Sequence, residues 1–156
     1  MSHGQAGVQA TIQQRLGRGF DPAELRRIKR LWVRHSIAED RRDIDGLIAT
    51  LAADCVYEIV PTGQRWEGHD GARRFYGELF GAFPDNRFAL TDIVVGPQGV
   101  FEVATLTGTN EGPWAGAAPS GLPVSLQVLI LFPWDPVTER FSGERIWFDR
   151  GLLGSA

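Results

Sequence analysis

The sequence predicts an α+β domain in which a curved, mixed or antiparallel sheet wraps around three N-terminal helices. Two observations support this prediction: helix-forming patterns end near residue 84, and four strand-like runs follow one another from Arg87 onward. A sheet curved around helices in this way would enclose a conical pocket. At 156 residues the chain has the size of one domain, with residues 1–20 as a flexible polar lead-in and residues 21–156 as the domain.

Three helices are predicted in the first half of the chain. The first begins at Asp21-Pro22-Ala23-Glu24, where the aspartate can cap the helix, the proline suits its first position and the glutamate completes a capping box. This helix runs to about Ala38, with an apolar stripe that faces the core. A second helix opens at Asp43, and a third is capped by His69 or Asp70.

Strand-like runs surround and follow these helices. They are predicted at Cys55–Val60, Arg87–Val95, Val100–Thr109, Val124–Phe132 and Phe141–Asp149. The connection Gly108–Gly121 is far longer than a hairpin needs and is rich in glycine, proline and small residues around Trp114. We interpret it as a lip with an exposed tryptophan over an opening, which predicts a protein that contains a small molecule.

The run Val124–Phe132 indicates that the outer face of the sheet is covered. Leu126, Val128 and Ile130 occupy one face of this strand, and Leu129 and Leu131 occupy the other. A sheet face turned to water would alternate polar and apolar residues. Since no further segment is left to form a covering layer, we expect a homodimer through this face.

Composition excludes several functional classes. A formal net charge of −3 lacks the basic footprint of a nucleic-acid-binding protein, and no apolar run is long enough to span a membrane. The single cysteine, Cys55, cannot form an internal disulfide and favours a cytoplasmic location. The three histidines show no metal-ligand spacing with one another or with Cys55, so a metal site is not expected.

Five segments in order resemble the SnoaL-like polyketide cyclase branch of the NTF2-like superfamily. They are Trp66-Glu-Gly-His-Asp-Gly71, Phe83-Pro-Asp85, Gly108-Thr-Asn-Glu-Gly112, Ala115–Gly121 and Phe148–Leu153. The resemblance covers about residues 22–153 and implies a cone-shaped cavity in a homodimer. In the best-known members it also implies cofactor-free ring closure of polyketide esters. Other relatives isomerise steroids, hydrolyse epoxides, dehydrate, or bind without catalysis, so the fold does not choose among these functions.

The positions that carry ring-closure chemistry in that family differ in this chain. The cyclases' acid/base aspartate in the final strand falls at Ile146, and polar cavity positions of the neighbouring strand fall at Val128 and Ile130. The family's first-strand asparagine aligns near Tyr57, and the histidine of the glycine-rich tract is replaced by Asn110. The resemblance therefore supports the fold more strongly than it supports the cyclase reaction.

Two carboxylates near the end of the chain are the candidate acid/base groups. Strand alternation places Glu144 on the same face as Ile146 and Phe148, so it should point into the cavity. A carboxylate poorly solvated among apolar residues is one way in which a fold prepares a general acid or base. Asp149 is the aspartate that the resemblance retains; it either approaches the cavity or caps the short tail that follows it.

The remaining polar candidates each have a functional and a structural interpretation. Tyr57 could hydrogen-bond a substrate carbonyl or be a satisfied core tyrosine. Asn110 could orient a carbonyl or stabilise its loop, and Trp114 could be a lid or part of the dimer interface. His35 lies on the inner stripe of the first helix, where a core histidine satisfied by a neighbour is the favoured interpretation. Cys55 has no visible base partner and is expected to be a buried apolar residue.

Three functions remain open. The first is a cofactor-free cyclase or isomerase acting on an apolar carbonyl or polyketide-like compound, with Glu144, Asp149 and Tyr57 as catalytic residues. The substrate-binding residues would be Asn110, Trp114, Val128, Ile130, Ile146 and Phe148. The alternative is a non-catalytic protein that binds an apolar ligand. An epoxide hydrolase is a weaker third choice, because it needs an arginine between two aspartates and no inward-facing strand arginine supplies it.

Overall fold

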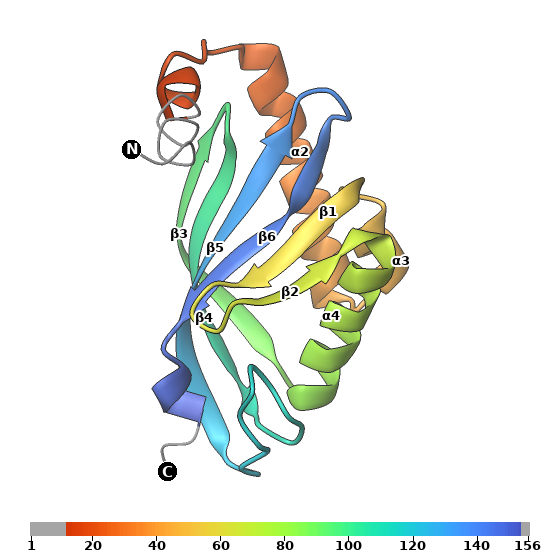
Figure 1. The fold of residues 1–156 in the computed structure, drawn as a ribbon, viewed down its shortest axis with the longest axis vertical. Helices are drawn as coiled ribbons and strands as arrows, with labels where there is room; N and C mark the ends of the chain where they lie inside the picture. Colours follow the sequence, from red (N-terminus) through yellow and green to blue (C-terminus); the bar gives the residue numbers. More distant parts are fainter. Residues whose placement is uncertain (1–11, 154–156) are drawn as a thin grey trace, which may run out of the picture.

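The computed structural model describes residues 12–153 and confirms the α+β class (Figure 1). Its main helices are α2 (Pro22–Asp40), α3 (Ile44–Ile48) and α4 (Gly68–Ala82), and a 3-10 turn, η1 (Arg150–Leu153), follows the last strand. The strands are β1 (Leu51–Ile59), β2 (Gln64–Glu67), β3 (Arg87–Gly96), β4 (Gly99–Thr109), β5 (Pro123–Asp135) and β6 (Arg140–Phe148). The predicted lead-in falls partly on residues 1–11, outside the described residues, while residues 12–16 are helical.

One six-stranded sheet holds all the strands in the order β2-β1-β6-β5-β4-β3. The pairing of β1 with β6 is parallel and the other pairings are antiparallel, so the sheet is mixed. Figure 1 shows α2, α3 and α4 gathered on one side of this curved, unclosed sheet. Among residues 12–153, none of the helices combines the length and the hydrophobicity needed to span a bilayer.

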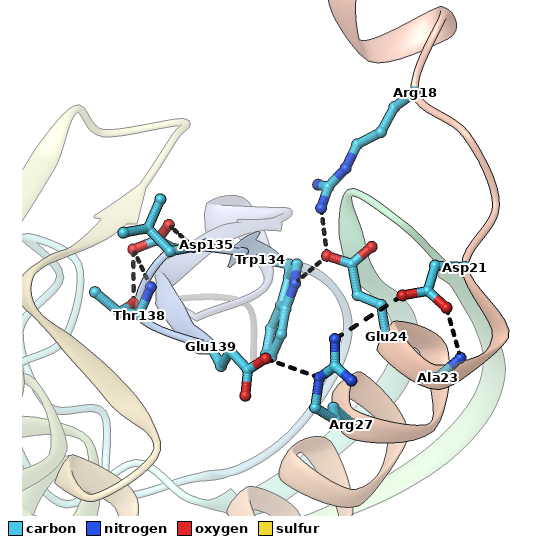
Figure 2. A network of polar contacts seen from close by, with 10 residues as sticks. Arg18, Asp21, Ala23, Glu24, Arg27, Trp134, Asp135, Thr138 and Glu139 are labelled. Atoms are coloured by element: carbon cyan, nitrogen blue, oxygen red, sulfur yellow. Dashed lines mark hydrogen bonds and ion pairs between the residues drawn. The ribbon is translucent and has the colours of Figure 1, made fainter.

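The first turn of α2 is held by a residue that precedes the helix and by a residue of strand β5 (Figure 2). Asp21 caps the helix, as predicted, by accepting a hydrogen bond from the amide of Ala23 at 2.9 Å. Glu24 does not complete a capping box: its carboxylate is buried and instead accepts from the indole of Trp134 at 2.9 Å and pairs with Arg18. The β5–β6 hairpin is thereby fastened to the first turn of α2.

The entry to α4 differs from the prediction. The helix begins at Gly68 and its N-cap, Glu67, makes no side-chain capping bond. His69 lies within the first turn, and its Nε2 contacts the carbonyl of Leu51 at 3.2 Å instead of capping. The residues before the helix form the short edge strand β2, which the sequence did not reveal because its four residues carry little hydrophobic alternation.

A bulge at Gly143 lets β6 lie close against β1. This glycine has φ +108°, and a Cβ built on it would lie 2.0 Å from the carbonyl oxygen of Val56. Only glycine fits such a backbone approach. Directly after the bulge, Glu144 lies opposite Tyr57 across the parallel pair, and both side chains face the core.

The segment between β4 and β5 is packed down instead of standing open as a lip with an exposed tryptophan. Trp114 is only 5% exposed, and its ring stacks on that of Trp66 with centroids 6.5 Å apart. The amide of Glu111 donates to the carbonyl of Ala82 at the end of α4, at 2.8 Å. Asn110 ties the segment to itself, because its side chain donates to Gly112 and accepts from Ser120. The segment closes one end of the core.

Candidate active site

A buried polar cluster joins α2, α4, β1 and β6 at the centre of the domain. His35 Nε2 lies 3.1 Å from Oε1 of Glu144 and 3.0 Å from the hydroxyl of Tyr76. The Tyr76 hydroxyl donates to the same Glu144 oxygen at 2.8 Å, and the hydroxyl of Tyr57 lies 2.9 Å from that of Tyr76. None of these four side chains is more than 3% exposed. The cluster is a closed hydrogen-bonded network.

The hydrogen bonds around Thr50 determine which ring nitrogen of His35 carries a fixed proton. The Thr50 hydroxyl has one hydrogen, which it donates to the carbonyl of Leu47 at 2.7 Å. Its oxygen must therefore accept from Nδ1 of His35, also 2.7 Å away. Because Nδ1 carries a hydrogen, Nε2 is the ring atom that can exchange a proton, and it faces Oε1 of Glu144 at 3.1 Å.

The hydroxyls of the cluster stay protonated. Burial raises the pKa of Tyr57 and of Tyr76 well above the ordinary value of 10, and the negative charge of Glu144 raises both pKa values further. Tyr76 uses its hydrogen toward Glu144, so the hydrogen between the two phenols comes from Tyr57. The chain of donors therefore runs from Tyr57 through Tyr76 to Glu144.

An inner cavity of about 230 Å³ lies beside this cluster, between α2 and the inner face of the sheet. Its lining residues are Trp32, His35, Ser36, Glu39, Asp40, Phe88, Leu90, Glu102, Ala104 and Phe132. Half of these lining residues are apolar and half are polar or charged, and three of the latter are carboxylates. Concave spaces with converging polar groups are typical of small-molecule sites. The ring of His35 connects the cavity to the polar cluster.

Two carboxylates of the cavity have perturbed acidities. Glu102 on β4 is 6% exposed, and desolvation, helped by the charge of Glu144, raises its pKa to about 7, although the Trp32 indole donates to its Oε2 at 2.9 Å. Burial, followed by the charges of Glu144, Glu102 and Asp40, raises the pKa of Glu39 well above the usual carboxyl range. Both shifts favour the protonated form of a carboxyl group.

A larger recess of about 770 Å³ lies outside the inner cavity. It is lined by Glu39, Asp40, Arg42, Pro84, Asp85, Asn86, Arg87, Phe88 and Ala89. Glu39, Asp40 and Phe88 also line the inner cavity, so the two spaces adjoin.

The structure brings some of the predicted site residues together. Glu144 and Tyr57 are members of the buried cluster. The apolar candidates lie on the same inner face, where Val128 pairs with Phe148 and Ile130 with Ile146 across β5 and β6. This agrees with the alternation used to place Glu144.

Other predicted residues lie elsewhere. Asp149 is exposed and accepts from the amide of Gly151 at 2.9 Å, which makes it a cap of η1. Asn110 and Trp114 are buried in the β4–β5 segment and line neither space described above. Cys55 is buried, and desolvation raises the pKa of its thiol to about 11, so it is a poor nucleophile.

The central members that sequence reasoning missed are Tyr76 and Glu102. Tyr76 sits on an apolar helix stripe and looks like a core aromatic; the available signal was that a buried phenol needs a hydrogen-bond partner. Glu102 lies in a strand of mostly apolar and small residues, and the alternation of side chains along this strand could have shown that it points inward. Their partners could not be identified, because they lie 68 and 70 residues away along the chain.

No three His, Cys, Asp or Glu side chains within residues 12–153 gather in a way that could hold a metal ion. The polar side chains of the site include carboxylates, an imidazole and phenols. These groups transfer protons and donate hydrogen bonds.

A family model described as SnoaL-like polyketide cyclase matches residues 25–152. The chain belongs to the SnoaL-like polyketide cyclase family. A search of curated proteins finds no match to this SnoaL-like chain. The NTF2-like fold prediction is confirmed by many similar solved structures.

Three of these structures illustrate the range of the SnoaL-like fold. A candidate SnoaL-like polyketide cyclase from Jannaschia sp. CCS1 is 23% identical, with a TM-score of 0.70 over 90% of this chain and 99% of its own. An NTF2-like protein of unknown function from Burkholderia pseudomallei K96243 is 17% identical, with a TM-score of 0.69 over 83% and 98%. AclR, a candidate hydroxylase from Streptomyces galilaeus, is 21% identical, with a TM-score of 0.64 over 81% and 77%. At these identities the similarity establishes the fold.

Proposed function

We propose that this SnoaL-like chain is an enzyme that moves a proton on a small, largely apolar carbonyl compound without a cofactor. The observation that carries the proposal is the 3.1 Å contact between His35 Nε2 and Glu144 Oε1, next to a cavity that the His35 ring lines. Such a pair can release its proton to a bound molecule and take one back. Cyclisation and isomerisation of carbonyl compounds both need this step.

The surroundings of the pair support this role. Both phenols remain protonated; Tyr76 donates to the Glu144 carboxylate, and Tyr57 hydrogen-bonds the Tyr76 hydroxyl. The inner cavity admits a small ring, and the adjoining recess accommodates the rest of a larger substrate. The apolar lining residues Phe88, Leu90 and Phe132 favour a substrate that presents an apolar ring to the inner cavity.

The test is exchange of the protons next to the carbonyl group of a ring ketone, 2-tetralone, in heavy water, followed by NMR. We expect the wild-type protein to accelerate exchange and Glu144→Gln to lower the acceleration about 100-fold or more. Asp149→Asn should leave it unchanged, since Asp149 caps η1. Circular dichroism verifies that each variant is folded. Equal exchange by wild type and Glu144→Gln would reject the mechanism.

A non-catalytic binding protein is the second candidate. It is favoured by the apolar side chains at Val128, Ile130 and Ile146, the positions where the cyclases of the family are polar or acidic. Native mass spectrometry would then reveal a co-purified apolar ligand, together with ketone binding that produces no exchange. The epoxide hydrolase hypothesis gains no support, because Arg145 on β6 points outward to Glu58, at 3.3 Å.

We further propose that the chain forms a homodimer through the outer face of the sheet. Five half-buried apolar side chains adjoin there on β4, β5 and β6: Phe101, Val103, Leu129, Leu131 and Trp147. Removing such a patch from water favours association. Sedimentation should give twice the mass of one chain for wild type and a monomer for Leu129→Lys. A monomeric wild type would exclude this dimer.

A further inference from the structure

Glu102 is a buried carboxylate that the His35–Glu144 pair does not use. It lies on β4, the second strand from the sheet edge, and its side chain points to the concave face opposite Ile130 of β5. It is 6% exposed and lines the inner cavity. Within residues 12–153, the hydrogen bond found for this carboxylate is the one from Trp32 to Oε2, at 2.9 Å. Oε1 is left for a bound molecule.

The cavity lies between Glu102 and His35. Glu102 comes from the sheet and His35 from α2, and both residues line the same space of about 230 Å³. A small molecule that fills this space therefore meets one proton-carrying group from the helix and another from the sheet. Two groups in this relation can act as acid and base in the same step.

We propose that Glu102 is the base of the site, taking a proton from the carbon next to a substrate carbonyl while the His35–Glu144 pair protonates the carbonyl oxygen. This inference rests on the proposed function and extends it to one reaction class, enolisation. The carbon–hydrogen bond breaks and its electron pair forms the enol double bond. Glu102 becomes a carboxylic acid, and the pair is left as neutral imidazole and carboxylate. The reverse step restores all groups.

The other charged groups near Glu102 support this assignment. His35, Glu39 and Asp40 approach from α2, Glu144 lies on β6, and the β3 side chains of the cavity are apolar. Among residues 12–153, no lysine or arginine lines the inner cavity. With its pKa raised to about 7, Glu102 can both accept and return a proton near neutral pH.

Ketone exchange with Glu102→Gln tests the assignment. We expect Glu102→Gln to bind 2-tetralone, detected by NMR shifts of the ketone, but to lose about 100-fold or more of the exchange rate. Glu102→Asp should restore part of the rate, and the wild-type rate should rise with pH as Glu102 ionises. The control is Glu78→Gln, because Glu78 also accepts from a tryptophan indole, that of Trp66, but on α4 away from the cavity.

The outcomes separate this inference from the proposed function. Exchange that is lost in Glu144→Gln but kept in Glu102→Gln would overturn the role of Glu102 alone. If exchange is lost in Glu39→Gln but kept in Glu102→Gln, the base would be Glu39 and not Glu102. If wild type catalyses no exchange of bound 2-tetralone, both proposals fail. Titration of the carboxyl carbon by NMR is an independent measurement: a Glu102 that ionises at the ordinary carboxyl value would contradict its role as base.

Discussion

His35 on α2 and Glu144 on β6 are 109 residues apart in the chain, and Nε2 of one lies 3.1 Å from Oε1 of the other inside the core. Each is satisfied by further partners, Thr50 for the imidazole and Tyr76 for the carboxylate. A single interaction thus links the first long helix to the last strand and places an acid/base pair beside a cavity. The same contact is part of the folded core and of the proposed chemistry.

Removal of the Glu144 carboxylate should destabilise the protein strongly. In Glu144→Ala, His35 Nε2 and the Tyr76 hydroxyl lose their common acceptor in a closed core, which we expect to cost about 3 to 5 kcal/mol. Glu144→Gln retains an acceptor and should cost less. Urea denaturation measures both, and Glu58→Ala is the control because its partner Arg145 is exposed. Similar losses for Glu144→Ala and Glu58→Ala would contradict this view of the core.

Stability should fall between pH 5 and pH 8 because of Glu102. Its pKa is 4.5 ordinarily and about 7 in the folded protein. Between these values the unfolded chain releases the proton while the folded protein keeps it, so rising pH favours unfolding. Below the unfolded-state pKa of 4.5 this difference stabilises the folded protein by about 3 kcal/mol. The stabilisation is lost as the pH rises through the folded-state pKa of about 7. Denaturation across this range should show the decline in wild type and a smaller one in Glu102→Gln.

Glu78→Gln serves as the control for that titration. Glu78 accepts an indole hydrogen bond from Trp66 at 3.3 Å, so the substitution repeats the chemical change at an exposed site. The stability of Glu78→Gln should therefore decline with rising pH as much as that of the wild type. Glu39 contributes in the same direction as Glu102, since its pKa is also raised. An undiminished decline in Glu102→Gln would show that Glu102 does not titrate as described.

Tyrosine ionisation should accompany unfolding. Tyr57 and Tyr76 are the only tyrosines of the chain, and the pKa of each is raised above 10 by burial and by Glu144. Above about pH 10 the unfolded chain loses these protons first, so stability falls as pH rises. Tyrosinate absorbance should therefore appear together with the loss of circular dichroism. Reversible absorbance near pH 10 in a folded protein would refute the closed network.

Gly143 should tolerate no side chain. Its φ is +108°, and an added Cβ would lie 2.0 Å from the Val56 carbonyl oxygen, so Gly143→Ala must separate β6 from β1. We expect a loss of about 4 kcal/mol or more, or failure to fold. Gly77→Ala is the matched control, because Gly77 lies in α4 with open space around it and should gain about 0.5 to 1 kcal/mol. Thermal unfolding of both variants measures the difference.

Local patterns predicted most of the fold. Helix α2 begins at Pro22, directly after its predicted cap Asp21, and the four C-terminal strands lie close to their expected ranges. Strand alternation correctly turned Glu144 inward with Ile146 and Phe148. The exceptions are the entry to α4 and the short strand β2, where local signals are weak.

The β4–β5 segment shows the limit of reasoning from composition. Its glycines and prolines correctly indicated irregular structure, but they did not indicate whether Trp114 faces solvent. The tryptophan is buried because Trp66, Phe75 and Phe83 form an aromatic surface against which it packs. Those residues belong to distant segments, so this contact depends on the assembled core.

The sequence by itself determined the α+β class, the family and the inward direction of Glu144, because capping, alternation and short motifs are local properties. Only the tertiary structure decided which polar groups meet. Helix α2 brings His35, α4 brings Tyr76, and the parallel pairing of β1 with β6 sets Tyr57 beside Glu144. These contacts span separations of 41 to 109 residues, which no local pattern encodes. The candidate chemistry follows from that packing.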